Sequence, residues 1–84
     1  MAHIPHTELS VPPLQPGKYR HYKGDYYEVV GVGLHSENQE PMVIYRPLHN
    51  SPVPYWVRPY DMFIQHVVIG GQQVPRFEKV DDDA

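Results

Sequence analysis

The stretch that decides the fold is the run YYEVVGVGL at residues 26–34. Its residues are mostly aromatic, β-branched or glycine, a composition that favours an extended strand over a helix. Val30, Val32 and Leu34 stand at alternate positions, so we expect these three side chains to face the core. The two glycines between them are typical of a bulge or a sharp bend in a strand. The run therefore predicts one long, bent β-strand.

Shorter strands are predicted on both sides of this run. An aromatic strand at residues 19–22 precedes it, and the tight-turn composition of residues 23–25 joins the two as a hairpin. Further strands are expected at residues 42–46, 55–58, 65–69 and 74–77, the last on a sheet edge because it contains Pro75. Residues 59–63 suit a single 3₁₀ turn, with Pro59 near its start.

Five to six short strands without a long helical period leave few architectures for a chain of 84 residues. We predict a mainly β fold, a small and strongly bent antiparallel SH3-like barrel with the 3₁₀ turn near residues 59–63. The barrel is expected to form one domain over residues 17–80. Four prolines in residues 1–16 predict a Pro-rich tail, in which the P-x-x-P spacing at 13–16 is interpreted as a semi-rigid spacer. Residues 81–84, DDDA, predict an acidic disordered tail.

The charge is balanced everywhere except in the acidic tail. The formal net charge is −3, and the three aspartates of residues 81–83 supply all of it, so residues 1–80 carry none. This balance disfavours a duplex-DNA binder, which normally carries a basic stripe. No apolar run approaches the ~18 residues of a membrane span, and the first ten residues lack the apolar region of a secretory signal. We therefore expect a soluble cytoplasmic protein with no membrane partner.

Neither catalysis nor metal binding is expected. His35, Ser36 and Glu37 include the residue types of a catalytic triad, but neighbouring side chains diverge in an extended segment or loop, so we interpret them as a polar turn. The absence of Cys excludes thiolate zinc sites and a Cys nucleophile. The four histidines between residues 21 and 66 come from separate segments, and we interpret them as solvent-facing or singly hydrogen-bonded. The prediction is a non-enzyme without cofactor or metal.

Aromatic and basic residues are interleaved along several of the predicted strands. The chain has ten aromatic residues, seven Tyr, two Phe and one Trp, more than so small a barrel can enclose. Some rings must then be exposed beside guanidinium groups, an arrangement suited to stacking and to binding carboxylate or phosphate. The residues that we select as ligand-binding candidates are Arg20, Tyr22, Tyr45, Arg46, Trp56, Arg58 and Tyr60.

A structural interpretation of the same residues stays open. In this interpretation three of the tyrosines, Tyr19, Tyr27 and Tyr45, pack in the core. Arg46 and Arg58 then form structural ion pairs with Glu28 or Asp61.

Several co-linear motifs resemble a known family. They are GKYRHYKG (17–24), YYEV (26–29), HSE (35–37), VIYR (43–46), WVRP (56–59), MF (62–63) and PRF (75–77). Together they resemble the DUF1653 family, small bacterial domains of unknown function. The resemblance covers residues 17–77 and implies no reaction, ligand or catalytic residue. One difference is the link between Arg46 and Trp56, where residues 49–54 bring two extra prolines.

Three functions remain open at this point. The first is a module that docks a peptide or protein segment on the aromatic and arginine surface, with Arg46 or Arg58 binding a charged end. The second is a weak binder of single-stranded nucleic acid, in which Tyr22, Trp56 and Tyr60 stack on bases. Phosphates are bound by Lys18, Arg20 and Lys23 under this interpretation. The third is a homodimer whose interface is the aromatic surface.

Overall fold

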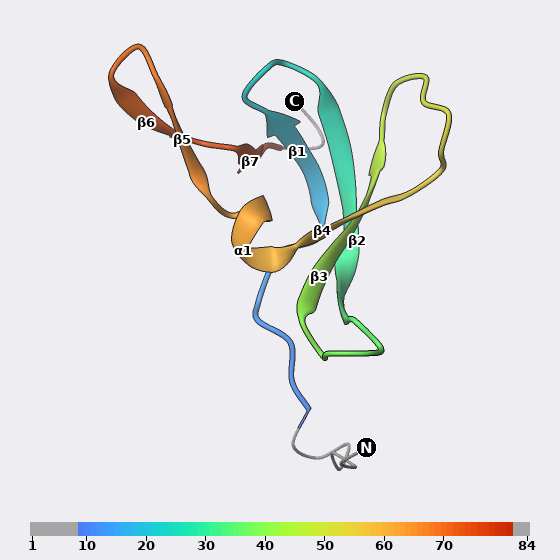
Figure 1. Ribbon diagram of the computed structural model, residues 1–84. Helices are drawn as coiled ribbons and strands as arrows, with labels where there is room; N and C mark the ends of the chain where they lie inside the picture. The colour runs from blue at the N-terminus through green and yellow to red at the C-terminus, as the bar shows by residue number, and fades with distance from the viewer. Residues whose placement is uncertain (1–8, 82–84) are drawn as a thin grey trace.

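The computed structural model describes residues 9–81 of the chain (Figure 1). Within these residues the elements are β1 (Gly17–His21), β2 (Tyr26–Leu34), β3 (Pro41–Pro47), β4 (Trp56–Pro59), α1 (Tyr60–Phe63), β5 (His66–Ile69), β6 (Gln72–Pro75) and β7 (Phe77–Lys79). The prediction of a mainly β fold is confirmed. The chain has seven strands in this part instead of five or six, because the predicted strand at residues 74–77 is divided between β6 and β7. The outer parts of the two predicted tails, residues 1–8 and 82–84, lie outside the described residues.

The main sheet has five antiparallel strands in the order β4-β3-β2-β1-β7. β5 and β6 form a separate two-stranded hairpin, which projects away from this sheet in Figure 1. β4 and β7 stand at opposite edges of the main sheet and do not pair with each other. The strands of the described part therefore do not close into a hydrogen-bonded barrel, and the SH3-like barrel stays a prediction.

The backbone of Arg76 links the hairpin to the main sheet. Its N–H donates to the Gln65 carbonyl at 3.0 Å, and its carbonyl accepts from the Tyr22 N–H at 3.0 Å. Pro75, the residue before it, is the last residue of β6, which pairs with β5. After Arg76 the chain forms β7, which pairs with β1. The single strand predicted from the sequence is divided here because its two halves pair with different partners.

A β-bulge in β2 changes which side of the strand faces the core. Val29 pairs with Tyr45 of β3, and the next paired residue of β2 is Gly31. Val30 is thus the extra residue, and its side chain is 53% exposed while that of Val29 is 1% exposed. The prediction that Val30 faces the core is wrong, because an inserted residue shifts the alternation of the strand by one. Beyond the bulge, Val32 packs against the core.

The core is built mainly from aromatic rings. Its buried residues are Tyr19, Val29, Val43, Tyr45, Phe63 and Phe77. Phe63 and Phe77 stack with ring centroids 4.1 Å apart and an interplanar angle of 4°. Tyr45 meets both phenylalanines edge to face, at 5.4 and 5.5 Å. A small set of rings from α1, β1, β3 and β7 therefore holds the sheet and the helical turn together.

The helical turn α1 carries Phe63 into this core and packs on β3 and β4. The Ile64 N–H donates to the Tyr60 carbonyl four residues earlier, at 3.1 Å, which is the α-helical pattern. The predicted 3₁₀ turn is therefore in the right place but of the wrong type. No helix within residues 9–81 is long and apolar enough to cross a membrane.

Residues 9–16 have no regular secondary structure, but they do not leave the domain. The Tyr60 hydroxyl donates to the Pro13 carbonyl at 3.0 Å, and Leu14 packs against the core. In Figure 1 this blue segment runs past α1 before it enters β1.

The bulge predicts opposite outcomes for two neighbouring valines. Val29→Ala removes buried methyl groups and should lower the free energy of unfolding by about 2 kcal/mol. Val30→Ala changes an exposed side chain and should stay within about 0.5 kcal/mol of wild type. Urea denaturation of both variants measures the difference. A larger loss for Val30→Ala than for Val29→Ala would mean that β2 has no bulge at this place.

Candidate functional site

A pocket of about 370 Å³ opens beside the aromatic core. Each strand of the main sheet contributes to its lining, and residues 49–52 of the β3–β4 loop complete it. The lining residues from the strands are His21, Tyr27, Tyr45, Trp56, Arg58 and Phe77. We call this site the aromatic pocket.

Tyr27 connects the walls of the aromatic pocket. Its ring meets those of Tyr45, His49 and Phe77 edge to face, with centroid distances of 5.5, 5.4 and 5.7 Å. Burial, more than the charges nearby, raises the pKa of the Tyr27 phenol above its ordinary value. Tyr27 therefore stays protonated at neutral pH and keeps an O–H donor at the pocket.

Arg58 supplies the positive charge of the aromatic pocket. Its Nε donates to the Tyr45 hydroxyl at 3.2 Å, and its guanidinium carbon lies 5.6 Å from the centre of the Phe77 ring. Within residues 9–81, Arg46 forms an ion pair with Glu28, whereas Arg58 forms no ion pair. The side chain is thus held in place by neutral partners, and its terminal N–H groups remain suited to an anion.

His21 lies in the positive field of this pocket. Burial lowers its pKa below the ordinary 6.5, and the charges of Arg58, Arg76 and Lys23 lower it further against a smaller opposite effect of Asp25. The Nδ1 atom of His21 accepts a hydrogen bond from the Lys23 N–H at 3.1 Å, which requires that nitrogen to be unprotonated. The aromatic pocket therefore combines one arginine cation with a neutral imidazole.

Of the residues that the structure describes, none that lines the aromatic pocket is acidic. Aromatic faces suit a flat or proline-like group, and a guanidinium held at one wall suits a carboxylate or a phosphate. The arrangement can therefore hold an anionic group with an apolar group attached to it.

The seven ligand-binding candidates chosen from the sequence do not form one surface. Tyr45, Trp56 and Arg58 line the aromatic pocket, although Tyr45 is only 4% exposed. Arg46 lies outside this lining and pairs with Glu28 at 2.5 Å, as the structural interpretation expected.

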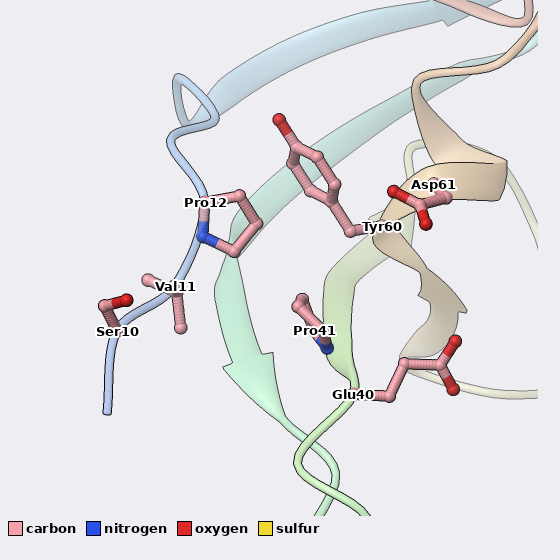
Figure 2. A pocket seen from close by; sticks show the side chains of 7 residues that line it. All are labelled: Ser10, Val11, Pro12, Glu40, Pro41, Tyr60 and Asp61. Atoms are coloured by element: carbon pink, nitrogen blue, oxygen red, sulfur yellow. The ribbon is translucent and has the colours of Figure 1, made fainter. Parts of the chain in front are cut away.

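The remaining three candidates lie at two other places. Arg20 and Tyr22 border a hollow beside β6, together with Ile69 of β5. Tyr60 lies on α1 next to the N-terminal segment, as Figure 2 shows.

Three lining residues on the strands, His21, Tyr27 and Phe77, were not selected from the sequence, and neither were residues 49–52 of the loop. Every second side chain of a strand lies on the same face, and this alternation points to two of these residues. His21 shares a face of β1 with buried Tyr19, and Tyr27 shares a face of β2 with buried Val29. No comparable local signal marks Phe77.

The segment at His35 is a turn, as interpreted from the sequence. The Ser36 hydroxyl donates to Glu37, and the Nδ1 atom of His35 accepts from the Glu37 N–H at 3.1 Å. The Asn38 side chain accepts from the Glu40 N–H at 2.9 Å, which closes the turn between β2 and β3. Within residues 9–81 no three His, Asp or Glu side chains come together in a way that could hold a metal ion.

Comparisons with known proteins identify a family without an assigned function. Residues 17–79 match the model of a family described as a protein of unknown function, DUF1653. The fold is similar to the crystal structure of a DUF1653 protein from Bordetella bronchiseptica, with a TM-score of 0.75 and 35% sequence identity. That alignment covers 80% of this chain and 87% of the Bordetella chain. No curated protein matches the sequence.

The lowered pKa of His21 predicts a loss of stability in acid. Below about pH 6.5 the unfolded chain protonates this histidine while the folded protein keeps it neutral. The stability that His21 contributes is therefore complete above that pH and is lost as the pH falls through the lowered folded-state value. Urea denaturation from about pH 7.5 to about pH 5 should show a smaller acid loss for His21→Gln than for wild type.

The matched control for this titration is His66→Gln, which changes an exposed histidine of β5. It should follow the wild-type pH profile. The prediction is wrong if His21→Gln also follows that profile.

Proposed function

Because this chain belongs to the DUF1653 family, whose description assigns no activity, we propose its function from the geometry of the aromatic pocket. The protein is a binding module that docks a peptide or protein segment by a carboxylate end. The observation that carries this proposal is the state of Arg58. Its guanidinium lies against Phe77, is fixed by the Tyr45 hydroxyl, and forms no ion pair within the described residues.

The chemistry around Arg58 favours a carboxylate joined to an apolar residue. A planar guanidinium binds a carboxylate through two parallel hydrogen bonds, and these are stronger where water is partly excluded. Trp56 and Tyr27 offer ring surfaces for the residue next to the charged end. A volume of about 370 Å³ is near the lower limit for ligand sites, so the pocket suits a short terminal segment.

The fold adds support by analogy. Small, strongly bent β-domains with clustered Tyr and Trp commonly bind peptides, and the SH3-like arrangement that we predicted from the sequence belongs to this group. A binding role also requires no catalytic group, in keeping with our proposal that the protein is not an enzyme.

Single-stranded nucleic acid has less support as a ligand. The three rings expected to stack on bases, Tyr22, Trp56 and Tyr60, border three separate hollows. Two of the basic residues expected to bind phosphates, Lys18 and Lys23, lie over tyrosine rings at 4.6 and 5.9 Å from their centres.

A homodimer would use an edge of the sheet. β4 is an edge strand, and its Trp56 and Val57 are 44% and 60% exposed. Pairing of β4 with a second copy would cover these side chains, so light scattering of the full chain at several concentrations separates this alternative from peptide binding.

Peptide docking can be followed directly because Trp56 is the one tryptophan of the chain and lines the aromatic pocket. We expect the immobilised protein to enrich members of a pool of short synthetic peptides with free C-termini. An enriched peptide should change the Trp56 fluorescence in a saturable way, and its C-terminally amidated twin should bind at least about tenfold more weakly. Arg58→Gln should weaken binding of the free-acid peptide by a similar factor.

Arg20→Gln is the matched control, since it makes the same change at an exposed arginine of β1 outside the lining of the aromatic pocket. It should bind the peptide as wild type does. Equal binding of acid and amide, or no effect of Arg58→Gln, would contradict the proposed role of Arg58.

Salt dependence tests the nucleic-acid alternative. We expect a labelled single-stranded oligonucleotide of mixed sequence to show no saturable rise in fluorescence anisotropy at low salt. Binding that weakens steeply between low and moderate salt would instead indicate phosphate contacts and support that alternative.

A further inference from the structure

A second set of contacts lies apart from the aromatic pocket, where residues 11–16 run past α1 and lead into β1. We call these residues, VPPLQP, the proline arm. Two tyrosine hydroxyls of the domain donate to its backbone, Tyr60 to the Pro13 carbonyl at 3.0 Å and Tyr19 to the Gln15 carbonyl at 2.6 Å. Between these two contacts Leu14 packs against the core. The arm is therefore held by a carbonyl, a side chain and a carbonyl in succession.

The sequence of the proline arm prepares it for this role. Each of its three prolines has a φ fixed near −65°, and each residue before a proline is confined to extended conformations. Leu14 is thus the one arm residue that neither rule restrains. A polyproline II segment makes no internal hydrogen bonds and leaves its carbonyls free to accept from a partner. Little conformational entropy is therefore lost when the arm docks.

The surface that receives the arm has the chemistry of a polyproline site. Figure 2 shows Pro12 of the arm and Tyr60 of α1 facing each other, with Pro41 nearby on β3. Aromatic side chains that pack on proline rings and donate to the carbonyls are the usual means of binding polyproline II segments. Burial, and then the neighbouring Tyr60, raise the pKa of the Tyr19 phenol, so its O–H donor persists at neutral pH.

The receiving surface is larger than the arm covers. A hollow of about 430 Å³ remains between the arm and the domain, bounded by Val11 and Pro12 on one side and by Glu40, Pro41 and Asp61 on the other (Figure 2). The arm and the surface also differ in their relation to the family match. The family match covers residues 17–79, so Tyr19 and Tyr60 belong to the family domain while the arm precedes it.

We propose that Tyr19, Tyr60 and the core around them form a polyproline II binding site that the chain's own arm occupies. The hollow beside the arm and the aromatic pocket have no lining residue in common. A proline-rich segment of another molecule binds the same surface once the arm is released. A tethered ligand acts at an effective concentration in the millimolar range, so the docked arm weakens any competitor.

The test uses the full chain with its arm released. Leu14→Ser removes the apolar contact that lies between the two hydrogen bonds. The two-dimensional amide NMR spectrum of the variant shows whether it remains folded. The probes are a synthetic peptide of residues 9–17 and a twin with its three prolines replaced by alanine. In Leu14→Ser, we expect the first peptide to cause saturable changes in the amide chemical shifts of residues near Tyr60. The alanine twin should bind this variant about tenfold more weakly. The first peptide should bind the wild-type protein about tenfold more weakly than it binds Leu14→Ser. Equal binding of the two peptides, or none, would overturn the proposal.

A second measurement does not depend on Leu14→Ser. Tyr60→Phe removes the donor to Pro13 and should expose the arm to a prolyl endopeptidase, raising its cleavage rate severalfold above wild type. Tyr55→Phe makes the same change at a 57% exposed tyrosine that is not part of the hollow beside the arm. It should be cleaved at the wild-type rate. An unchanged rate for Tyr60→Phe would show that Tyr60 does not hold the arm.

Discussion

The stack of Phe63 on Phe77 is the contact on which the rest of the structure depends. Phe63 comes from the single turn of α1 and Phe77 is the first residue of β7, so this pair joins the helical turn to an edge strand of the main sheet. The domain has no disulfide and few buried aliphatic residues, so rings must supply most of its apolar burial. Aromatic side chains bury a large apolar area for each side chain that is ordered.

The core shares side chains with both proposed binding surfaces. Tyr45 and Phe77 are buried, yet they also line the aromatic pocket and position Arg58. Tyr19 is buried as well, and its hydroxyl holds the proline arm. A domain this small has no separate layer of residues to support a site, so the core tyrosines Tyr19 and Tyr45 keep their rings inside and make the contacts of the two proposed sites with their hydroxyls. The parts of both surfaces that these buried residues form are held in place by the packing of the core.

The charge of the aromatic pocket arises from pairing and not from an excess of basic residues. Residues 1–80 are balanced, but Arg46 pairs with Glu28 while Arg58 is bound by a neutral hydroxyl. The local field is therefore positive in a chain whose body is neutral. Burial first, and then this field, lower the pKa of the nearby His21. Net charge describes long-range attraction, whereas selectivity at one pocket depends on which charges remain without an opposite partner.

The sequence by itself determined the β class and the hairpin that ends with the long strand β2. It also determined the position of the turn at Tyr60 and the polar turn at His35. These features depend on the φ/ψ preferences and the alternation of residues within a short segment. The sequence also singled out Trp56 and Arg58, which share one face of β4. Only the tertiary structure decided that Val30 points outward, that Pro75 ends one strand and Phe77 begins another, and that His21, Tyr27 and Phe77 meet around Arg58. Each of these depends on the register between strands distant in sequence, and a one-residue shift in that register moves side chains to the opposite face.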